Sequence, residues 1–407
     1  MSERVETEVA VVGGGLVGPL LALALARTGQ QVALVERVPE SLQAEPGFDG
    51  RAYAIALASS RLLGAVGLWG DLEPLAEPIR DIKVSEGPAG APAGLHFDPR
   101  ALDEARVGWI LEDRYLRRAL LSAVAAEPGI TRIGPAAVVS ARFEDGCAHL
   151  GLNSGAALVA TLAVAADGRG SALARLAGIG RQVFGYGQTG LVAAIEHERP
   201  HQGIAHQSFF PGGPFAVLPL PGNRSGLVWS EREGEARRLM ALDDAGYEVA
   251  LARRIGPRLG RLRLVVPRRA HPLSLELADA YVAPRLALAG DAAHGVHPIA
   301  GQGLNMGLRD VAALAEVIVG ARGRGEDIGD PGVLMRYERW RRFDNTSFAL
   351  GMDGLARLFS NASPLLGALR RTGLSVVDAS APAKRFFMRE AAGLAGRLPV
   401  MLEGRLP

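Results

Sequence analysis

Short apolar runs and one apolar helical stretch alternate near the start of the chain. Residues 8–12 are an apolar run, residues 13–18 are rich in glycine, and residues 20–28 have the composition of a buried helix that ends at Gly29. A second apolar run, residues 31–35, follows directly. Since short apolar runs on either side of a helix are typical of parallel strands joined by a crossover, we predict a βαβ unit here.

The middle of the chain continues with both kinds of element. Residues 112–126 carry apolar side chains four residues apart, which predicts a helix with one buried face. Residues 137–153 predict a hairpin that turns at Asp145, and residues 159–166 predict a buried strand. Over residues 182–275 extended stretches are broken by Pro and Gly, which indicates a mostly antiparallel sheet.

These patterns together predict an α/β fold. We expect a Rossmann-like domain that is discontinuous in sequence, an antiparallel β-sheet domain for the substrate, and a helical C-terminus, because 407 residues suit two or three domains. The expected segments are residues 1–74, 100–181 and 276–330 for the Rossmann-like domain, 75–99 and 182–275 for the sheet domain, and 331–407 for the helical region.

The turn of the predicted βαβ unit carries a dinucleotide-binding signature. Gly13, Gly15 and Gly18 have Gly-x-Gly-x-x-Gly spacing, and Glu36 stands eighteen residues beyond the last glycine, at the end of the second strand. Such glycines let backbone amides approach a pyrophosphate, and the acid can bind the adenosine ribose. We include the neighbouring Arg37 among the expected nucleotide contacts.

A second match to the glycine pattern, residues 185–190, lacks this context. No apolar strand precedes it, and residues 191–196 after it are extended rather than helical. We therefore predict a loop that enters a strand, and no nicotinamide-binding fold.

Charge and cysteine content narrow the possible partners. The formal net charge is +2, and no run of Lys or Arg with interleaved aromatic residues points to nucleic acid. The single cysteine, Cys147, excludes an internal disulfide and a multi-cysteine metal site. Residues 9–26 are uncharged, but three consecutive glycines and Pro19 interrupt them and mainly acidic residues precede them. We expect a soluble cytoplasmic protein rather than a membrane span or a signal sequence.

Residues 290–305, GDAAHGVHPIAGQGLN, join an isolated acid to a glycine-rich helix entry. Gly290 and Asp291 follow the apolar run 286–289, which predicts a strand that presents Asp291 at its end. A carboxylate in that position can accept a hydrogen bond from the ribitol chain of a flavin.

The helix entry itself favours an anionic ligand. Gly301 and Gly303 leave room for a close approach, and the predicted helix start leaves free backbone amides at Gly303, Leu304 and Asn305. Reduced flavin carries negative charge near N1 and the C2 oxygen, so these amides suit the pyrimidine edge of a flavin ring.

This stretch resembles the second flavin motif of the group A flavoprotein aromatic monooxygenases, the para-hydroxybenzoate hydroxylase-like enzymes. More narrowly, GDAAH followed by HPIAGQGLN is similar to the ubiquinone-biosynthesis branch of FAD-dependent hydroxylases. The resemblance extends over nearly the whole chain, including residues 49–51, 209–219 and 389–393. It implies a Rossmann-like FAD-binding domain, with FAD as cofactor and NADH or NADPH as reductant.

The implied activity is hydroxylation of the aromatic ring of a polyprenylated phenol in ubiquinone biosynthesis, through a flavin C4a-hydroperoxide. By the same resemblance, Asp167 belongs to an Asp-Gly motif near the pyrophosphates, Pro298 lies over the flavin edge, and Arg51 and Arg114 lie near the FAD phosphates. The two arginines are equally compatible with surface ion pairs.

Two histidines flank the flavin turn. His294 and His297 lie three residues apart, but Asp291 is committed to the flavin and no suitable third ligand is present, so we expect no metal. We expect His294 to be structural and bonded to backbone. His297, nearer the ring, is a candidate to position or deprotonate the phenol.

Two alternative functions stay open: hydroxylation of a small soluble phenol or polyketide-like compound, and a non-catalytic, flavin-bound role in a ubiquinone-biosynthesis complex. Membership of such a complex and an oligomer are both compatible with the sequence. Because the implied substrate tail is apolar, the apolar and basic residues of 355–371 predict either peripheral contact with the inner face of a membrane or packing on the protein.

Overall fold

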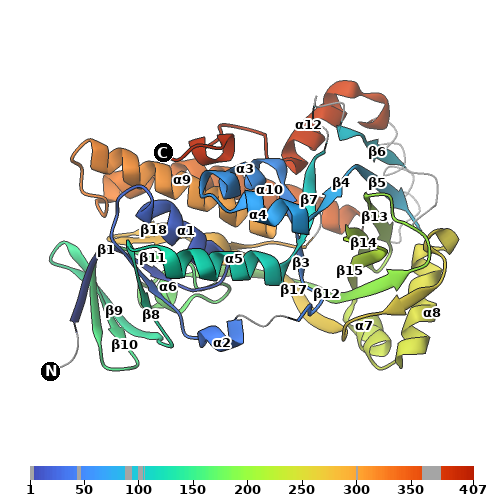
Figure 1. Cartoon of the computed structure of the whole chain (residues 1–407), viewed down its shortest axis with the longest axis horizontal. Coiled ribbons are helices and arrows are strands. Elements are labelled where there is room, and N and C mark those ends of the chain that lie inside the picture. The colour runs from blue at the N-terminus through green and yellow to red at the C-terminus, as the bar shows by residue number, and fades with distance from the viewer. Residues whose placement is uncertain are drawn as a thin grey trace.

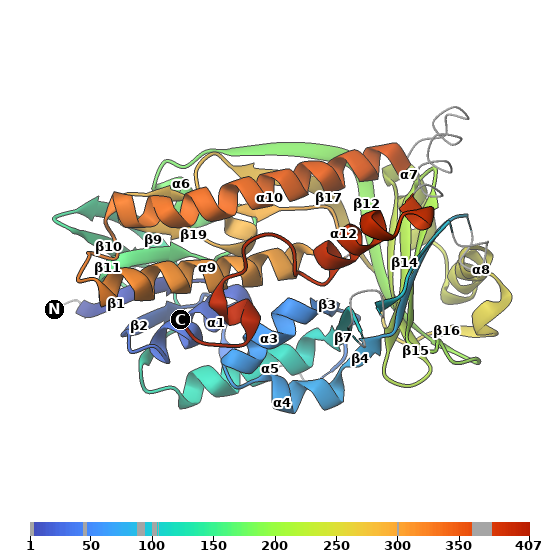
Figure 2. The same cartoon turned by 90° about the horizontal axis from the view of Figure 1, so that it is seen from above.

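Two large sheets and a pair of long helices organise the molecule. The computed structural model describes residues 4–43, 47–87, 94–99, 104, 106–298, 301–359 and 377–407. One sheet lies toward each end of the structure, and helices α9 (Gly303–Gly323) and α10 (Pro331–Phe359) run along the same side (Figure 1). Helix α10 reaches from the first sheet to the second (Figure 2), so the C-terminal region contacts both.

The first sheet is mostly parallel and Rossmann-like. Its described strands follow the order β18-β19-β11-β1-β2-β8, and β10 and β9 are attached to β11 as an antiparallel hairpin. Strand β1 pairs in parallel with β11 on one side and with β2 on the other. The strands are β1 (Arg4–Val12), β2 (Val32–Val35), β8 (Ile130–Ile133), β9 (Val138–Glu144), β10 (Cys147–Leu152), β11 (Ala157–Ala165), β18 (Val282–Ala283) and β19 (Leu286–Leu288).

Helix α1 (Val17–Ala26) connects β1 to β2 and confirms the predicted βαβ unit. It is buried along most of its length and contacts α5 (Asp113–Ala126) and α9. All four residues of β2 are buried, which explains why this strand reads as a continuous apolar run. Pro19 lies in the first turn of α1, where its missing amide is tolerated.

The second sheet is mostly antiparallel and carries helices on one face. Its described strands follow the order β20-β17-β12-β15-β14-β13-β5-β6, with β16 attached to β12 and a parallel β13–β5 pair. Helices α7 (Glu233–Met240) and α8 (Asp244–Ile255) pack on the face that carries Leu191, Phe215 and Trp229. The strands are β5 (Asp81–Glu86), β6 (Leu95–Phe97), β12 (Arg181–His197), β13 (Ile204–Phe210), β14 (Gly213–Leu220), β15 (Arg224–Arg232), β16 (Leu262–Leu264), β17 (Arg269–Ala278) and β20 (His294–Gly295).

A small sheet and several short helices complete the described fold. Strands β3 (Ala52–Ala56) and β4 (Glu77–Ile79) pair on either side of β7 (Gly108–Glu112). The remaining elements are α2 (Glu40–Gln43), α3 (Leu57–Ala65), α4 (Trp69–Leu72), α6 (Ala172–Leu176), α12 (Ala381–Ala391) and the 3-10 turns η1 (Glu73–Leu75), η3 (Pro257–Leu259), η4 (Gly290–Ala292) and η6 (Val400–Glu403).

The predicted fold class is confirmed, and one local prediction is wrong. Residues 185–190 do not form a loop before a strand, because they lie inside the 17-residue strand β12. The pairing of β12 with β17 shifts register between Gly185 and Thr189, and Gly187 adopts a φ of +62° within this bulge. The predicted domain boundaries remain predictions, and β17 runs across the one placed between residues 275 and 276.

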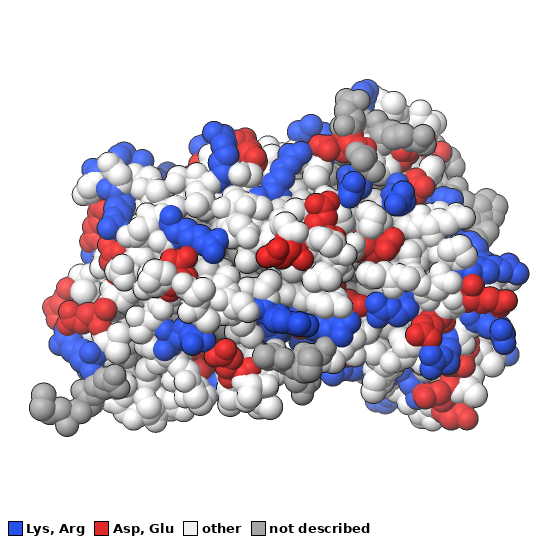
Figure 3. Space-filling view, in the orientation of Figure 1, with Lys and Arg blue, Asp and Glu red and all other residues white. Residues whose placement is uncertain are grey.

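The charge distribution on the surface and the length of the helices can be compared with the predictions about nucleic acid and membrane partners. Lys and Arg side chains are interspersed with Asp and Glu over the face in Figure 3. Within the described ranges, no helix is both long and apolar enough to cross a membrane. Most of the segment 355–371, for which we predicted membrane contact or packing, lies outside the described residues.

Candidate functional site

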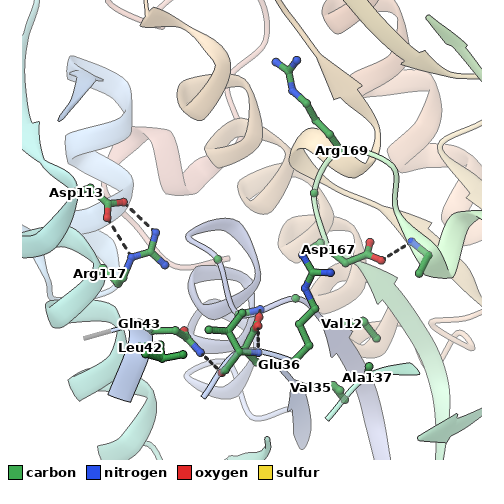
Figure 4. Close-up of a pocket in the computed structure, with 18 of the residues that line it drawn as sticks. Val12, Val35, Glu36, Leu42, Gln43, Asp113, Arg117, Ala137, Asp167 and Arg169 are labelled. Atoms are coloured by element: carbon green, nitrogen blue, oxygen red, sulfur yellow. Dashed lines mark hydrogen bonds and ion pairs between the residues drawn. The ribbon is translucent and has the colours of Figure 1, made fainter. Parts of the chain in front are cut away.

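A cavity of about 510 Å³ opens at the carboxyl ends of the parallel strands β1, β2 and β11. Its lining comes from the glycine turn after β1, the residues after β2 and β11, and the first turns of α5 (Figure 4). The carboxyl edge of a doubly wound sheet is where this kind of fold binds nucleotides.

The three predicted glycines have different surroundings. A Cβ on Gly13 would lie 2.3 Å from the Ala166 carbonyl oxygen, and one on Gly18 would lie 1.9 Å from the Gly13 carbonyl oxygen. These two positions must therefore be glycine for the turn to pack. A Cβ on Gly15 would meet no atom within 4 Å, and Gly15 lines the cavity. The open space at Gly15 is a cradle in which a pyrophosphate can approach the backbone.

Glu36 ties the glycine turn to the end of β2. One carboxylate oxygen accepts a short hydrogen bond from the Gly14 amide, and the other accepts one of 2.6 Å from the Val38 amide. Because a carboxylate has about four acceptor positions, ribose hydroxyls can still bind here. Arg37 also lines the cavity.

The two predicted arginines line the cavity and are also ion-paired. Arg51 contacts Asp113 at 3.3 Å, and Arg114 contacts Glu112 at 2.7 Å. Arg117, which was not predicted from the sequence, lines both cavities of the site and pairs with Asp113 at 3.0 Å (Figure 4). The (i, i+4) spacing of Asp113 and Arg117 on the predicted helix was the available signal.

Asp167 caps the helix that follows β11. One carboxylate oxygen accepts hydrogen bonds from the amides of Ala172 at 2.8 Å and Leu173 at 3.3 Å. Among the described residues, the other oxygen is buried without a hydrogen-bond partner. A buried acceptor of this kind is stabilised when a ligand hydroxyl donates to it.

A second cavity, of about 1190 Å³, continues from the first and is mostly apolar. The two cavities share Gly15, Arg117, Ala166, Gly168 and Arg169 in their linings. The second one extends from the start of α9 to the face of the second sheet opposite α7 and α8. Its apolar lining from that sheet and from α10 includes Ile82, Val84, Leu95, Phe97, Ala205, Phe209, Ala216, Leu218, Val228, Phe348, Met352 and Phe359.

The turn after β19 presents Asp291 to the second cavity. Gly290 adopts a φ of +62°, which favours glycine, and turns the chain into η4. The Asp291 carboxylate accepts a hydrogen bond of 3.3 Å from Arg169 Nε, and its backbone carbonyl accepts one of 3.2 Å from Arg181 Nη2. Arg169, another residue that sequence reasoning missed, directly follows the predicted Asp-Gly motif.

The first turn of α9 exposes backbone amides to the same cavity. Gly303, Leu304 and Asn305 line it, and neither a capping side chain nor an acidic side chain occupies the helix start. The Asn305 side chain is committed elsewhere, since its oxygen accepts from the Ala56 amide at 3.0 Å and its nitrogen donates to the Ala54 carbonyl at 2.8 Å. The helix start is thus left positive, which suits an anionic ligand edge.

His297 and Pro298 line the second cavity beside this helix start. The His297 ring makes an edge-to-face contact with the Tyr186 ring, with centroids 5.0 Å apart. Burial lowers the pKa of His297 to about 4, so the imidazole is neutral at pH 7. His294 is structural, but it bonds to the Asp310 carboxylate at 2.6 Å rather than to backbone, which corrects the prediction.

The structure gathers most of the predicted site residues around the two joined cavities. Gly18 and Gly290 line neither, because they pack behind the turns that they form. The first cavity is lined by Gly13, Gly15, Glu36, Arg37, Arg51, Arg114 and Asp167, and the second by Asp291, His297, Pro298, Gly301, Gly303, Leu304 and Asn305. No three His, Cys, Asp or Glu side chains of the described ranges are grouped to hold a metal ion.

The two cavities fit the two halves of FAD. The glycine cradle and Glu36 suit the adenosine diphosphate half, whereas the apolar second cavity with its amide-rich helix start suits a flat, apolar ring with one anionic edge. Residues 15, 168 and 169 lie where the halves would join.

Known proteins support this assignment. The profile of the FAD binding domain family matches residues 6–343. The chain is 46% identical to ubiquinone hydroxylase UbiL of Rhodospirillum rubrum (95% of this chain, 89% of the relative) and 36% identical to 3-demethoxyubiquinol 3-hydroxylase of Escherichia coli (95% and 99%). Among solved structures, p-nitrophenol 4-monooxygenase PnpA from Pseudomonas putida shares the fold, with a TM-score of 0.82 at 21% identity (97% and 99% covered). The chain therefore belongs to the FAD binding domain family, within the FAD-dependent aromatic monooxygenases that include the ubiquinone-biosynthesis hydroxylases.

Proposed function

We propose that this protein is an NAD(P)H- and O2-dependent FAD monooxygenase that hydroxylates the aromatic ring of a polyprenylated phenol in ubiquinone biosynthesis. The single observation that carries the proposal is the apolar part of the second cavity that lies beyond the flavin site, between the second sheet and α10. A small soluble phenol needs far less apolar space. The identities to two enzymes named for ubiquinone hydroxylation support the same substrate class.

The cavity offers separate places for the ring and for the isoprenoid tail. The aromatic ring is expected beside His297 and Pro298, next to the helix start that faces the flavin. The tail is expected along the apolar wall made by β5, β6, β13 and β14. Phe209 of β13 stacks on Phe359 of α10, with ring centroids 4.0 Å apart, so the second sheet and α10 close the cavity together.

Gln207 is a candidate to orient the substrate. It lines this mostly apolar cavity from β13, where its register neighbours Val84 and Ala216 also line it. The contacts among the described residues give its side chain no hydrogen-bond partner. In an apolar pocket, a few placed polar groups fix the ligand's orientation, so we expect the Gln207 amide to bind an oxygen substituent of the ring.

The chemistry divides between the cofactor and the chain. Bound FAD accepts two electrons from NAD(P)H and activates oxygen. The amides of Gly303, Leu304 and Asn305 stabilise negative charge at the pyrimidine edge, and the apolar walls exclude water from the reacting atoms. With a pKa of about 4, His297 is too weak a base to take a proton from a phenol of pKa about 10. We therefore propose that His297 positions the phenol through a hydrogen bond.

Deleting the gene in its host and identifying the accumulated quinone precursor by mass spectrometry tests the function. We expect a prenylated phenol that lacks one ring hydroxyl, and recovery of ubiquinone when the wild-type gene is returned. Normal ubiquinone together with lost oxidation of a soluble phenol would contradict the proposal and favour the small-phenol hydroxylase. Recovery of ubiquinone by a flavin-free Asp291 variant would contradict it in favour of a non-catalytic component.

We also propose that α12 contacts a membrane surface at the mouth of the cavity. Phe386 and Phe387 on this helix are 57% and 39% exposed, and Phe387 also lines the cavity. Lys384, Arg385 and Arg389 are on the same helix, and a helix that combines aromatic and basic residues suits an anionic bilayer.

Co-sedimentation with vesicles of anionic phospholipid tests this contact. We expect the double substitution F386S/F387S to reduce binding strongly, while F343S, which removes a 76% exposed phenylalanine of α10 that does not line the cavity, leaves binding unchanged. Equal binding by all three proteins would contradict the contact.

A further inference from the structure

A buried cluster of polar and charged side chains lies behind the turn that presents Asp291. Asp310 of α9 and His294 are fully buried, and Arg341 and Asn345 of α10 are each 1% exposed. Neither Asp310 nor Arg341 lines either cavity. The cluster therefore does not touch the cofactor and needs another explanation.

One carboxylate oxygen of Asp310 holds both ends of the turn. Its Oδ2 accepts a hydrogen bond of 3.0 Å from the Gly290 amide and contacts His294 Nε2 at 2.6 Å. Asp291 lies between these two contacts in the chain. Since Gly290 is in the left-handed region, with a φ of +62°, the turn is unusual and benefits from an acceptor fixed on its inner side.

The other carboxylate oxygen of Asp310 ties the turn to helix α10. Oδ1 of Asp310 accepts hydrogen bonds of 2.8 Å from Arg341 Nε and 3.0 Å from Asn345 Nδ2. Arg341 also donates to Asp344 at 3.1 Å. Burial by itself would raise the pKa of Asp310, but the neighbouring His294 and Arg341 hold it well below its usual range, so the carboxylate stays ionised. An ionised carboxylate makes stronger hydrogen bonds than a neutral acceptor.

We propose that Asp310 is a positioning residue for the flavin: together with Arg341 it fixes the Gly290–His294 turn so that the Asp291 carboxylate faces the cofactor. Through the Asp310 carboxylate, Arg341 of α10 contributes to FAD binding although it lines neither cavity. The inference rests on the FAD site of the proposed function and does not depend on which ring is hydroxylated.

A double-mutant cycle in FAD binding tests whether Asp310 acts through Asp291. The dissociation constant of FAD is measured by flavin fluorescence for the wild-type apoprotein and for D291N, D310N and D291N/D310N. We expect each single substitution to weaken binding at least tenfold, and the double variant to bind within about twofold of D291N. A merely structural role of Asp310 predicts that the two losses multiply, which would overturn the proposal, as would unchanged binding by D291N or by D310N.

Two further variants keep the test decisive if D310N fails to fold. D310L/R341M replaces the buried pair by apolar residues of similar size, which often preserves stability, yet it removes the acceptor for the Gly290 amide. We expect it to bind FAD at least tenfold more weakly, and wild-type binding would overturn the proposal. E231Q alters a buried carboxylate of β15 that lines neither cavity, and as a matched control we expect it to bind FAD as the wild type does.

Product formation at saturating FAD separates this inference from the proposed function. If the cycle fails while the wild-type enzyme hydroxylates its prenylated phenol, the role of Asp310 is overturned and the proposed function stands. If FAD binds as the cycle predicts but no prenylated phenol is hydroxylated, the proposed function is overturned and the role of Asp310 stands.

Discussion

The three predicted glycines of the turn after β1 serve two different purposes, packing of the fold and access of the cofactor to the backbone. At Gly13 and Gly18 an added Cβ would meet a backbone carbonyl oxygen of the protein itself. At Gly15, which lines both cavities, it would meet no atom within 4 Å. The same kind of residue therefore serves packing at two positions and ligand access at the third.

Substituting Gly18 and Gly15 one at a time should separate the effect on stability from the effect on FAD binding. We expect G18A to lower the free energy of unfolding of the apoprotein by roughly 2 kcal/mol or more, because the new Cβ overlaps the Gly13 carbonyl. We expect G15A to change it by less than about 0.5 kcal/mol, yet to weaken FAD binding about tenfold, or ~1.4 kcal/mol. Urea unfolding and FAD titration measure the two effects, and wild-type FAD affinity in G15A would place the pyrophosphate elsewhere.

The depressed pKa of His297 predicts an acid-dependent loss of stability. As the pH falls from about 6.5 towards 4, the unfolded chain takes up a proton on this imidazole before the folded chain does, so the folded state is destabilised. At pH 5 the expected loss relative to pH 8 is about 2 kcal/mol. Urea unfolding at pH 5 and pH 8 measures the loss of unfolding free energy in the wild type and in H297Q. We expect the loss in H297Q to be smaller than that in the wild type by about 2 kcal/mol. Identical pH dependence in the two proteins would contradict the buried, neutral imidazole.

At the residue scale, the sequence predicted side chains whose role depends on local backbone geometry. Gly13, Gly15 and Glu36 lie within one βαβ unit, so their spacing alone identifies the nucleotide turn. Asp310 and Arg341 were not predicted, because each is explained only by a partner about thirty residues away on another helix.

At the element scale, whether a segment forms a strand depends on the neighbouring strands with which it pairs, and the local sequence does not show these. The glycines at 185–190 look like a loop in isolation, but pairing with β15 and β17 on either side keeps the segment extended and confines the irregularity to a bulge. The helices α1, α5 and α9 were predictable from local sequence: α1 from its continuous apolar composition, α5 from apolar side chains four residues apart, and α9 from the apolar residues after its glycine-rich start.

The Asn305 side chain holds the start of α9 against β3 and α3. Asn305 accepts hydrogen bonds from the Ala56 amide and Ser59 Oγ, and both are buried. We expect N305A to lower the free energy of unfolding by about 1–3 kcal/mol, because it leaves buried donors unpaired. Thermal unfolding checks this, with the exposed loop substitution N223A as a control that should stay near wild type. Equal stability of the two variants would contradict the anchoring role.

At the scale of the whole molecule, the site exists only where distant segments meet. The second cavity combines the turn after β1, the start of α9, the second sheet and the end of α10, so neither its volume nor its apolar character was predictable from one segment. The sequence predicted the cofactor, and the assembled cavity is what supports the substrate class.

One buried acid joins the small sheet to the second sheet. Glu112 is fully buried and pairs with Arg114 at 2.7 Å and with Arg224 of β15 at 2.9 Å. We expect E112Q to lower the free energy of unfolding by about 3 kcal/mol, because both guanidinium groups lose their buried counter-ion. Denaturant unfolding measures the effect. Stability within about 0.5 kcal/mol of wild type would show that the pair contributes little to holding the sheets together.

The fate of molecular oxygen in the purified enzyme tests most directly whether this protein hydroxylates a prenylated phenol. With FAD, NADH or NADPH, a prenylated phenol in detergent and ¹⁸O₂, we expect a product that gains one hydroxyl containing ¹⁸O, detected by mass spectrometry. We also expect that G15A, assayed at limiting FAD, yields less of the same product. An enzyme that binds FAD and oxidises NAD(P)H but places ¹⁸O in no aromatic product would contradict the proposed hydroxylation.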